Sequence, residues 1–167
     1  RTFAPGQPFS THPSRPMTTP VRVVASNIIH RVIQGESLHT LLPSALDAAA
    51  TVDRPLCQEL VYGTLREWPL LAPLCQSYMK KPLRRKDSDI KTTICVGLYE
   101  LSHLNTPAHA VVSETVNAAR ALGKSWAAGL VNGILRNHQR RSEPLSDSLS
   151  LAQCNAMPDW LFDQLVA

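Results

Sequence analysis

Two short stretches of the sequence gather positive side chains, which are the ones that bind phosphate groups. The first is KKPLRRKD; the second, RNHQRR, places Arg136, Arg140 and Arg141 at the spacing i, i+4 and i+5 of one helical face. Arg22 and Arg31, on an earlier helical segment, extend the same expected surface. Such side chains contact phosphates without reading bases, and their binding weakens as salt rises. The candidate nucleic-acid-binding residues are Arg22, Arg31, Lys80, Lys81, Arg84, Arg85, Lys86, Arg136, Arg140 and Arg141.

The composition limits what this charge implies. The 167 residues include 17 Lys and Arg and 13 Asp and Glu, which gives a net charge of +4. That excess is compatible with an acidic partner, but a solvated loop and a solvated helix end explain it equally well. Aromatic residues make up only 5% of the chain, and few are interleaved with the basic runs. We therefore expect contact with phosphates rather than stacking on unpaired bases.

The tetrapeptide GTLR at 63–66 returns as GILR at 133–136, each within a run of helical character. Glycine destabilises a helix by roughly 0.8–1.0 kcal/mol relative to alanine, so its presence indicates that another backbone comes close. The arginine three positions later lies on nearly the same face and needs a carboxylate if it is buried. Two interpretations stay open: an arginine–glutamate network, favoured for Arg66, and an arginine directed at phosphate, favoured for Arg136. The structural candidates are Glu59, Gly63, Arg66, Glu114 and Gly133, with Glu100 as a further helical carboxylate.

No combination of residues has the spacing of a catalytic, cofactor or metal site. The six histidines are scattered, none belongs to an HExxH pattern, and no glycine-rich loop follows a strand. Cys57, Cys75, Cys95 and Cys154 have apolar neighbours and no CxxC spacing, which favours reduced, buried thiols in a cytoplasmic protein. No apolar run approaches the roughly 20 residues of a membrane span. Taken alone, the chain is expected to be non-enzymatic and to hold neither cofactor nor metal.

The elements that must position the basic residues are helices. From Val21 onward apolar residues recur with a helical period, no strand-like alternation persists, and the loops are short, which predicts an all-α bundle of about seven helices. Residues 1–19 are a predicted flexible tail, of which 1–16 are an upstream extension if Met17 is the start. The helical domain spans 20–142. Residues 143–167 are a polar linker followed by a helical restart at MPDWLFDQL.

Three runs carry a resemblance to a known family: LCQELVYGTLREW, VGLYELSHLNTPAHAVVSETVNAA and GLVNGILRNHQRR. In this order they resemble the N-terminal domain of the RsmB (Fmu/Sun) family of bacterial methyltransferases, which make 5-methylcytosine in 16S ribosomal RNA. That domain has the all-α fold of the transcription antitermination factor NusB. The resemblance covers about residues 21–141, and MPDWLFDQL is similar to the segment that leads toward the family's catalytic part.

The resemblance implies that this chain docks substrate RNA or positions a catalytic domain. In the family, a C-terminal Rossmann-like domain binds S-adenosylmethionine and attacks cytosine with the cysteine of a Pro-Cys motif. No cysteine here follows a proline, so none is expected to be the nucleophile, and we expect the sequence to be part of a longer protein. The implied partners are 16S ribosomal RNA and the protein's own methyltransferase domain. Two alternatives stay open: a protein-interaction or dimerisation module, and a free-standing NusB-type antitermination factor, against which GTLR and GILR argue.

Overall fold

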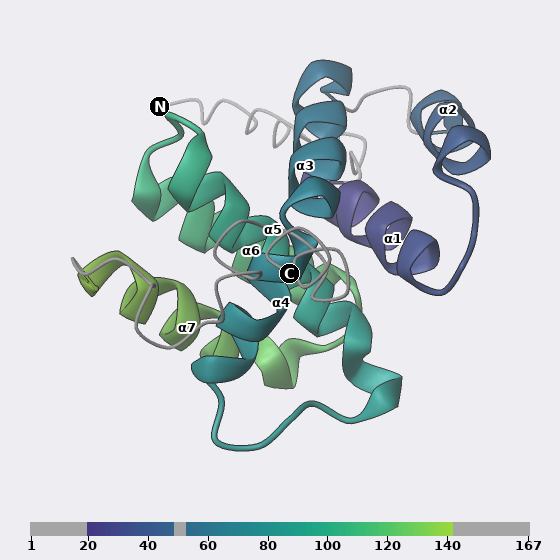
Figure 1. The fold of residues 1–167 in the computed structure, drawn as a ribbon. Coiled ribbons are helices and arrows are strands. Elements are labelled where there is room, and N and C mark those ends of the chain that lie inside the picture. The colour runs from purple at the N-terminus through teal and green to yellow at the C-terminus, as the bar shows by residue number, and fades with distance from the viewer. Residues whose placement is uncertain (1–19, 49–52, 142–167) are drawn as a thin grey trace, which may run out of the picture.

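The computed structural model describes residues 20–48 and 53–141, and these ranges form a bundle of seven α-helices (Figure 1). The helices are α1 (Val21–Ile33), α2 (Leu38–Ala48), α3 (Arg54–Arg66), α4 (Trp68–Ser77), α5 (Ser88–His103), α6 (Ala108–Ala121) and α7 (Ala128–Arg140). Two short 3-10 helices, η1 (Arg85–Asp87) and η2 (Ser125–Ala127), precede α5 and α7. No strand occurs in the described ranges, and the predicted all-α fold is confirmed. The predicted tail at 1–19 and the predicted linker and helix at 143–167 lie outside the described residues.

Local sequence signals set several helix boundaries. The Asp53 carboxylate accepts a hydrogen bond of 3.0 Å from the Leu56 backbone N–H and caps α3. Gly35 and Gly123 end α1 and α6 with φ angles of 102° and 75°, in the left-handed region that favours glycine. Asp87 precedes α5 but makes no capping hydrogen bond. Its carboxylate instead forms an ion pair with a lysine that is distant in sequence, as described below.

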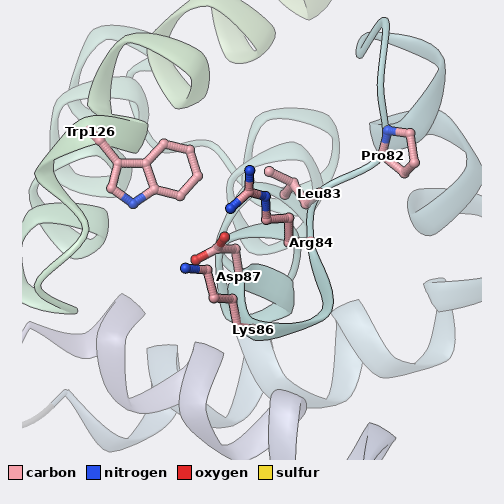
Figure 2. Close-up of a pocket in the computed structure, with 6 residues that line it drawn as sticks. All are labelled: Pro82, Leu83, Arg84, Lys86, Asp87 and Trp126. Atoms are coloured by element: carbon pink, nitrogen blue, oxygen red, sulfur yellow. The ribbon is translucent and has the colours of Figure 1, made fainter.

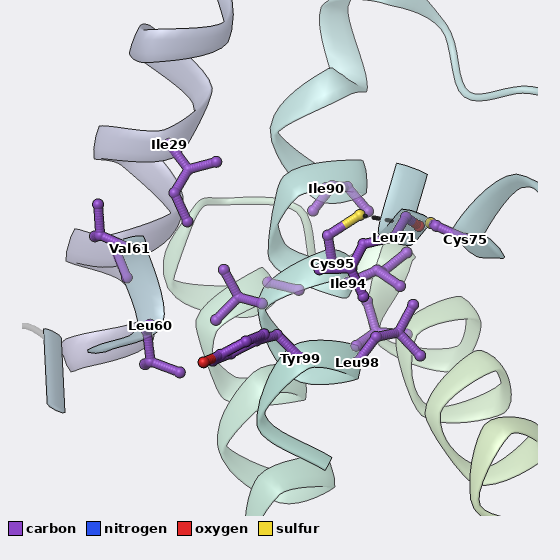
Figure 3. Close-up of a cluster of buried hydrophobic side chains, with 14 of the residues drawn as sticks. Ile29, Leu60, Val61, Leu71, Cys75, Ile90, Ile94, Cys95, Leu98 and Tyr99 are labelled. Atoms are coloured by element: carbon purple, nitrogen blue, oxygen red, sulfur yellow. Dashed lines mark hydrogen bonds between the residues drawn. The ribbon is translucent and has the colours of Figure 1, made fainter. Parts of the chain in front are cut away.

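Helix α5 is the centre of the bundle and packs against α1, α3, α4, α6 and α7 (Figure 1). Every residue from Thr92 to Glu100 is buried, as expected of a helix enclosed on all sides. Apolar side chains of the neighbouring helices, among them Ile29, Leu60 and Leu71, gather around it (Figure 3). The outermost helix, α2, packs against α1. The core therefore holds the helices around α5 and leaves their outer faces and the loops to carry charge.

Three cysteines are buried free thiols, as the sequence predicted. The Cys95 thiol points at the Leu71 carbonyl oxygen, 3.6 Å away (Figure 3). Burial raises the pKa of the Cys57 thiol to about 11 and raises that of Cys95 as well. Thiols with raised pKa values are poor nucleophiles at neutral pH. The fourth cysteine, Cys154, lies outside the described residues.

A buried ion pair joins α1 to α5. Nε and Nη2 of Arg22 donate to the two carboxylate oxygens of Glu100 at 2.8 and 2.6 Å. The Glu114 carboxylate on α6 lies 3.9 Å from another nitrogen of the same guanidinium. The prediction that Arg22 contributes to an RNA-binding surface is therefore wrong. Helix α1 packs against α2, α3, α5 and α6, so the face that carries Arg22 turns into the core, where two carboxylates neutralise its charge.

Of the two repeated glycines, only Gly63 lies at a close helix contact. A Cβ added to Gly63 would lie 2.0 Å from Cζ of Tyr99 on α5, and the Tyr99 hydroxyl donates a hydrogen bond of 2.6 Å to Glu59. A Cβ added to Gly133 would meet nothing within 4 Å, so the close contact predicted there is wrong. Gly133 faces outward because other residues form the inward face of α7. Those buried residues are Val131, Ile134 and Leu135.

The arginine of the first repeat is more exposed than predicted. The Arg66 side chain is 70% exposed and lies 4.0 Å from the Glu67 carboxylate. Arg66 is the last residue of α3, and from a helix end its long side chain reaches water. The prediction that Arg66 enters a packed arginine–glutamate network is therefore wrong. Such a network exists in the core, but its arginine is Arg22.

Candidate nucleic-acid interface

The basic connector, residues 80–86, follows α4, and its last two residues form the start of η1. Its end is held by hydrogen bonds and ion pairs from the loop between α6 and η2. The Lys124 ammonium donates to the Lys86 carbonyl oxygen at 2.8 Å and lies 3.1 Å from Asp87 and 2.5 Å from Asp89. Burial disfavours the charge of Lys124, but its hydrogen bonds to Asp89 and Asp87 raise its pKa. Asp87 and Asp89 thus share one ammonium, and within the described ranges neither forms an ion pair of 4.0 Å or less with a cation of the connector.

The start of the connector is tied to the other end of α7 through Tyr78. Its hydroxyl and Nδ1 of His138 share a hydrogen bond of 3.0 Å, and the Arg141 guanidinium lies 5.0 Å from the centre of the tyrosine ring. Nε2 of His138 lies 3.1 Å from the Ser102 hydroxyl. Burial, aided by the Arg141 charge, lowers the pKa of His138, so the ring is neutral at pH 7. We call residues 80–86, 124–126 and 136–141 together the connector–α7 surface.

The five cationic side chains of the connector are exposed. Within the described ranges, no ion pair of 4.0 Å or less involves any of its five cationic side chains. These residues are Lys80, Lys81, Arg84, Arg85 and Lys86. Unpaired cations on a loop that is held at both ends provide direct contacts for phosphate groups.

The arginines of the second basic run are exposed as well, but they do not share one face. Arg136 lines a pocket between α6 and α7, whereas Arg141 lies over Tyr78 at the end of α4. Arg141 follows the last residue of α7 and has an extended backbone, with ψ of 105°. The predicted single face of Arg136, Arg140 and Arg141 is therefore wrong, because the helix ends before its third member.

Arg31 lies apart from this surface and has a partner of its own. Its guanidinium makes two hydrogen bonds to the Glu36 carboxylate, at 2.7 and 2.5 Å. The helix that carries it, α1, packs against α2, α3, α5 and α6. The structure thus supports neither Arg22 nor Arg31 as part of the connector–α7 surface.

A polar pocket of about 390 Å³ between α6 and α7 adds an arginine that sequence reasoning missed. Arg120 and Arg136 both line it, and each donates to an asparagine of its own helix: Arg120 to Asn117 at 3.3 Å and Arg136 to Asn132 at 3.0 Å. His109 lines the same pocket. Arg120 gave no signal in the sequence, because a single arginine near the end of a helix is common. Two arginines in a polar pocket offer a further place for a phosphate group.

A second pocket, of about 380 Å³, opens beside the connector (Figure 2). Its lining residues are Pro82, Leu83, Arg84, Lys86, Asp87 and Trp126. Trp126 belongs to η2 and is 58% exposed. The sequence showed few aromatic residues among the basic runs, and the structure adds one, Trp126, beside the connector. Folding brings Trp126 to the connector from a distant part of the chain, a juxtaposition that proximity along the sequence does not reveal.

Residues 20–48 and 53–141 contain no group of three or more His, Cys, Asp and Glu side chains placed to hold a metal ion. Nor does any helix in them combine the length and apolar character needed to cross a bilayer. The fold and the surface together define an all-α module with an unpaired basic face.

The sequence pattern of the NusB family matches residues 19–140, and this chain belongs to that family. The similar proteins include "Ribosomal RNA small subunit methyltransferase B" of Vibrio vulnificus, 42% identical over 146 residues, which are 84% of this chain and 34% of that protein. The protein of the same name from Pseudomonas syringae pv. tomato is 40% identical over 149 residues, 87% of this chain and 33% of that protein. This chain therefore spans about a third of the length of these relatives. The resemblance indicated by the three sequence runs is confirmed.

Proposed function

We propose that this chain is a non-catalytic RNA-binding domain of a bacterial 16S ribosomal RNA cytosine-C5 methyltransferase. It docks ribosomal RNA in the cytoplasm for a catalytic domain that lies outside these 167 residues and uses S-adenosylmethionine. Membership of the NusB family and the names of the relatives support this choice of substrate.

The observation that carries the proposal is the connector–α7 surface. Within the described ranges, Asp87 and Asp89 pair with Lys124 rather than with the connector, so these three residues together offset only one of its five positive charges. Two arginines in the α6–α7 pocket add positive charge close to η2. Such side chains favour contact with the phosphates of folded RNA, which proteins recognise largely by shape and backbone.

In this proposal, this domain positions the RNA and the catalytic domain carries out the methyl transfer. Holding the RNA by its phosphates raises the local concentration of the target base near the tethered catalytic domain. Sequence choice then rests with the catalytic domain, since phosphate contacts carry no base information.

A salt titration of binding to a ribosomal RNA hairpin tests the proposal. The test variant is Arg84→Gln/Arg85→Gln/Lys86→Gln. The slope of log affinity against log salt should flatten by up to about 3, near 0.9 per lost duplex phosphate contact and less for single strands. The matched control, Arg31→Gln/Arg54→Gln/Arg66→Gln, removes the same charge from exposed arginines of α1 and α3 and should keep the parent slope.

The two triple variants have the same net charge, so a general electrostatic effect would change both slopes equally. That result, or a parent slope in the connector variant, would contradict the proposal. It would favour a protein-interaction module instead.

A further inference from the structure

We infer that Trp126, together with Arg84 and Lys86, forms a site for one unpaired nucleotide of the bound RNA, with its base stacked on the indole. The inference rests on the proposed RNA-binding function and goes beyond it, because phosphate contacts alone do not distinguish paired from unpaired RNA. The sequence alone, in which few aromatic residues are interleaved with the basic runs, gave little support for stacking.

Trp126 is exposed without being loosely attached. It lies in η2 between Lys124, which is held by Asp87 and Asp89, and Ala127, which is fully buried. Trp126 is nevertheless 58% exposed. A large aromatic side chain that is exposed and carried on a fixed backbone loses little freedom when a base stacks on it.

The surroundings of the indole suit a nucleotide. The pocket of about 380 Å³ falls within the range of small-molecule sites. Pro82 and Leu83 give it apolar walls for a base, and Arg84 and Lys86 give it cations for a phosphate (Figure 2). Figure 2 shows the Arg84 side chain extending toward the Trp126 ring. Among the described residues, the acidic residue that lines the pocket is Asp87, and its ion pair with Lys124 at 3.1 Å reduces its repulsion of a phosphate.

This combination favours single-stranded over double-stranded RNA. In a duplex both faces of a base are covered by its neighbours, whereas a base in a loop or bulge turns outward and stacks on an aromatic side chain. Because every base has a π-face, the site tolerates any of the four bases. Trp126 therefore makes the connector–α7 surface sensitive to unpaired positions rather than to sequence.

The test compares two labelled RNAs at one salt concentration: a hairpin with an unpaired loop, and a blunt duplex of the same stem. Trp126→Ala should weaken binding of the hairpin about tenfold, which corresponds to about 1.4 kcal/mol and lies within the range for one stacked base. Binding of the duplex should not change. Trp126→Phe should keep most of the affinity for the hairpin, because phenylalanine also stacks.

Tyr62 provides a matched control. It is 54% exposed but lies on α3, which packs against α1, α4 and α5. Tyr62→Ala should bind both RNAs like the parent. A fluorescent 2-aminopurine in the loop should be quenched by the parent protein and not by Trp126→Ala.

The outcomes separate this inference from the proposed function. If the parent binds the hairpin with the expected salt dependence but Trp126→Ala binds it equally well, the stacking site is wrong and the proposed function stands. An equal loss on both RNAs would also overturn the stacking site. A parent that binds neither RNA would overturn both proposals.

Discussion

The guanidinium of Arg22 on α1 is held by both carboxylate oxygens of Glu100 on α5, at 2.8 and 2.6 Å, where Glu100 is fully buried. This forked pair fixes the first helix of the domain to the central one. A basic residue near the start of the domain thus has its charge paired within the core.

Removing one partner of this pair should destabilise the domain strongly. Arg22→Met leaves the Glu100 carboxylate buried without its main partner, and the expected cost is about 3–5 kcal/mol in the free energy of unfolding. The measurement is urea denaturation followed by circular dichroism. The double variant Arg22→Met/Glu100→Met should regain much of that loss, because no buried charge is left unpaired. Arg31→Met, which removes an exposed ion pair, should unfold like the parent; equal losses in Arg22→Met and Arg31→Met would contradict the assignment.

The two repeated glycines should respond oppositely to alanine. Gly63→Ala places a methyl group against the buried Tyr99 ring, so we expect a loss of about 1–3 kcal/mol from overpacking. Gly133→Ala has open space and should stabilise α7 by up to about 1 kcal/mol, the difference in helix propensity. Thermal and urea unfolding of both variants check this. If the two variants changed stability in the same direction, the contact assigned to Gly63 would be wrong.

The domain should lose stability in alkaline solution. Burial raises the pKa of Cys57 from 9.0 to about 11, so the folded state holds the proton that the unfolded state releases. The resulting stabilisation is fully present below about pH 9 and is lost as the pH rises toward 11. Tyr99 contributes in the same sense at higher pH, because burial and its bond to Glu59 raise its pKa to about 12. Melting temperatures measured across this range should fall less steeply in Cys57→Ala, and an identical fall would show that Cys57 does not contribute.

The chain on its own should not transfer methyl groups. Its sequence shows neither the glycine-rich cofactor loop nor the Pro-Cys nucleophile that the resemblance assigns to the catalytic domain. Incubation with labelled S-adenosylmethionine and undermethylated small-subunit RNA should leave the RNA unlabelled. Label above that of a reaction without protein would contradict the non-catalytic assignment.

The helices could be predicted from the sequence because their signals are local. Asp53 caps α3 through a residue three positions away, and Gly35 and Gly123 end helices by their own backbone geometry. The width of a buried face is not a local property. Arg22 is buried because four helices pack against α1. The spacing of apolar residues along α1 does not reveal how many helices will pack against it.

In the candidate site, too, some features could be predicted from the local sequence and others depend on packing. The five cations of the connector could be listed from the sequence, since they are adjacent. In the part of the chain that the structure describes, the nearby Asp87 and Asp89 pair with Lys124 instead of with these cations, and the aromatic side chain beside them is Trp126. Lys124 and Trp126 reach the connector only through the packing of η2 and α7 against the rest of the bundle. Gly133 shows the opposite kind of error. The repeat of the motif predicted a close contact at both glycines, but only Gly63 has one.

The connector is held at both ends by contacts within the domain, and this affects the free energy of the proposed RNA binding. Lys124 holds its last carbonyl group, and Tyr78 joins its beginning to His138 and Arg141. The entropy of ordering these residues is therefore lost largely when the domain folds, not when RNA arrives. A preorganised loop of this kind converts weak individual contacts into usable affinity. Loosening the fastening at Tyr78, which lies outside the connector–α7 surface, should therefore weaken the proposed RNA binding.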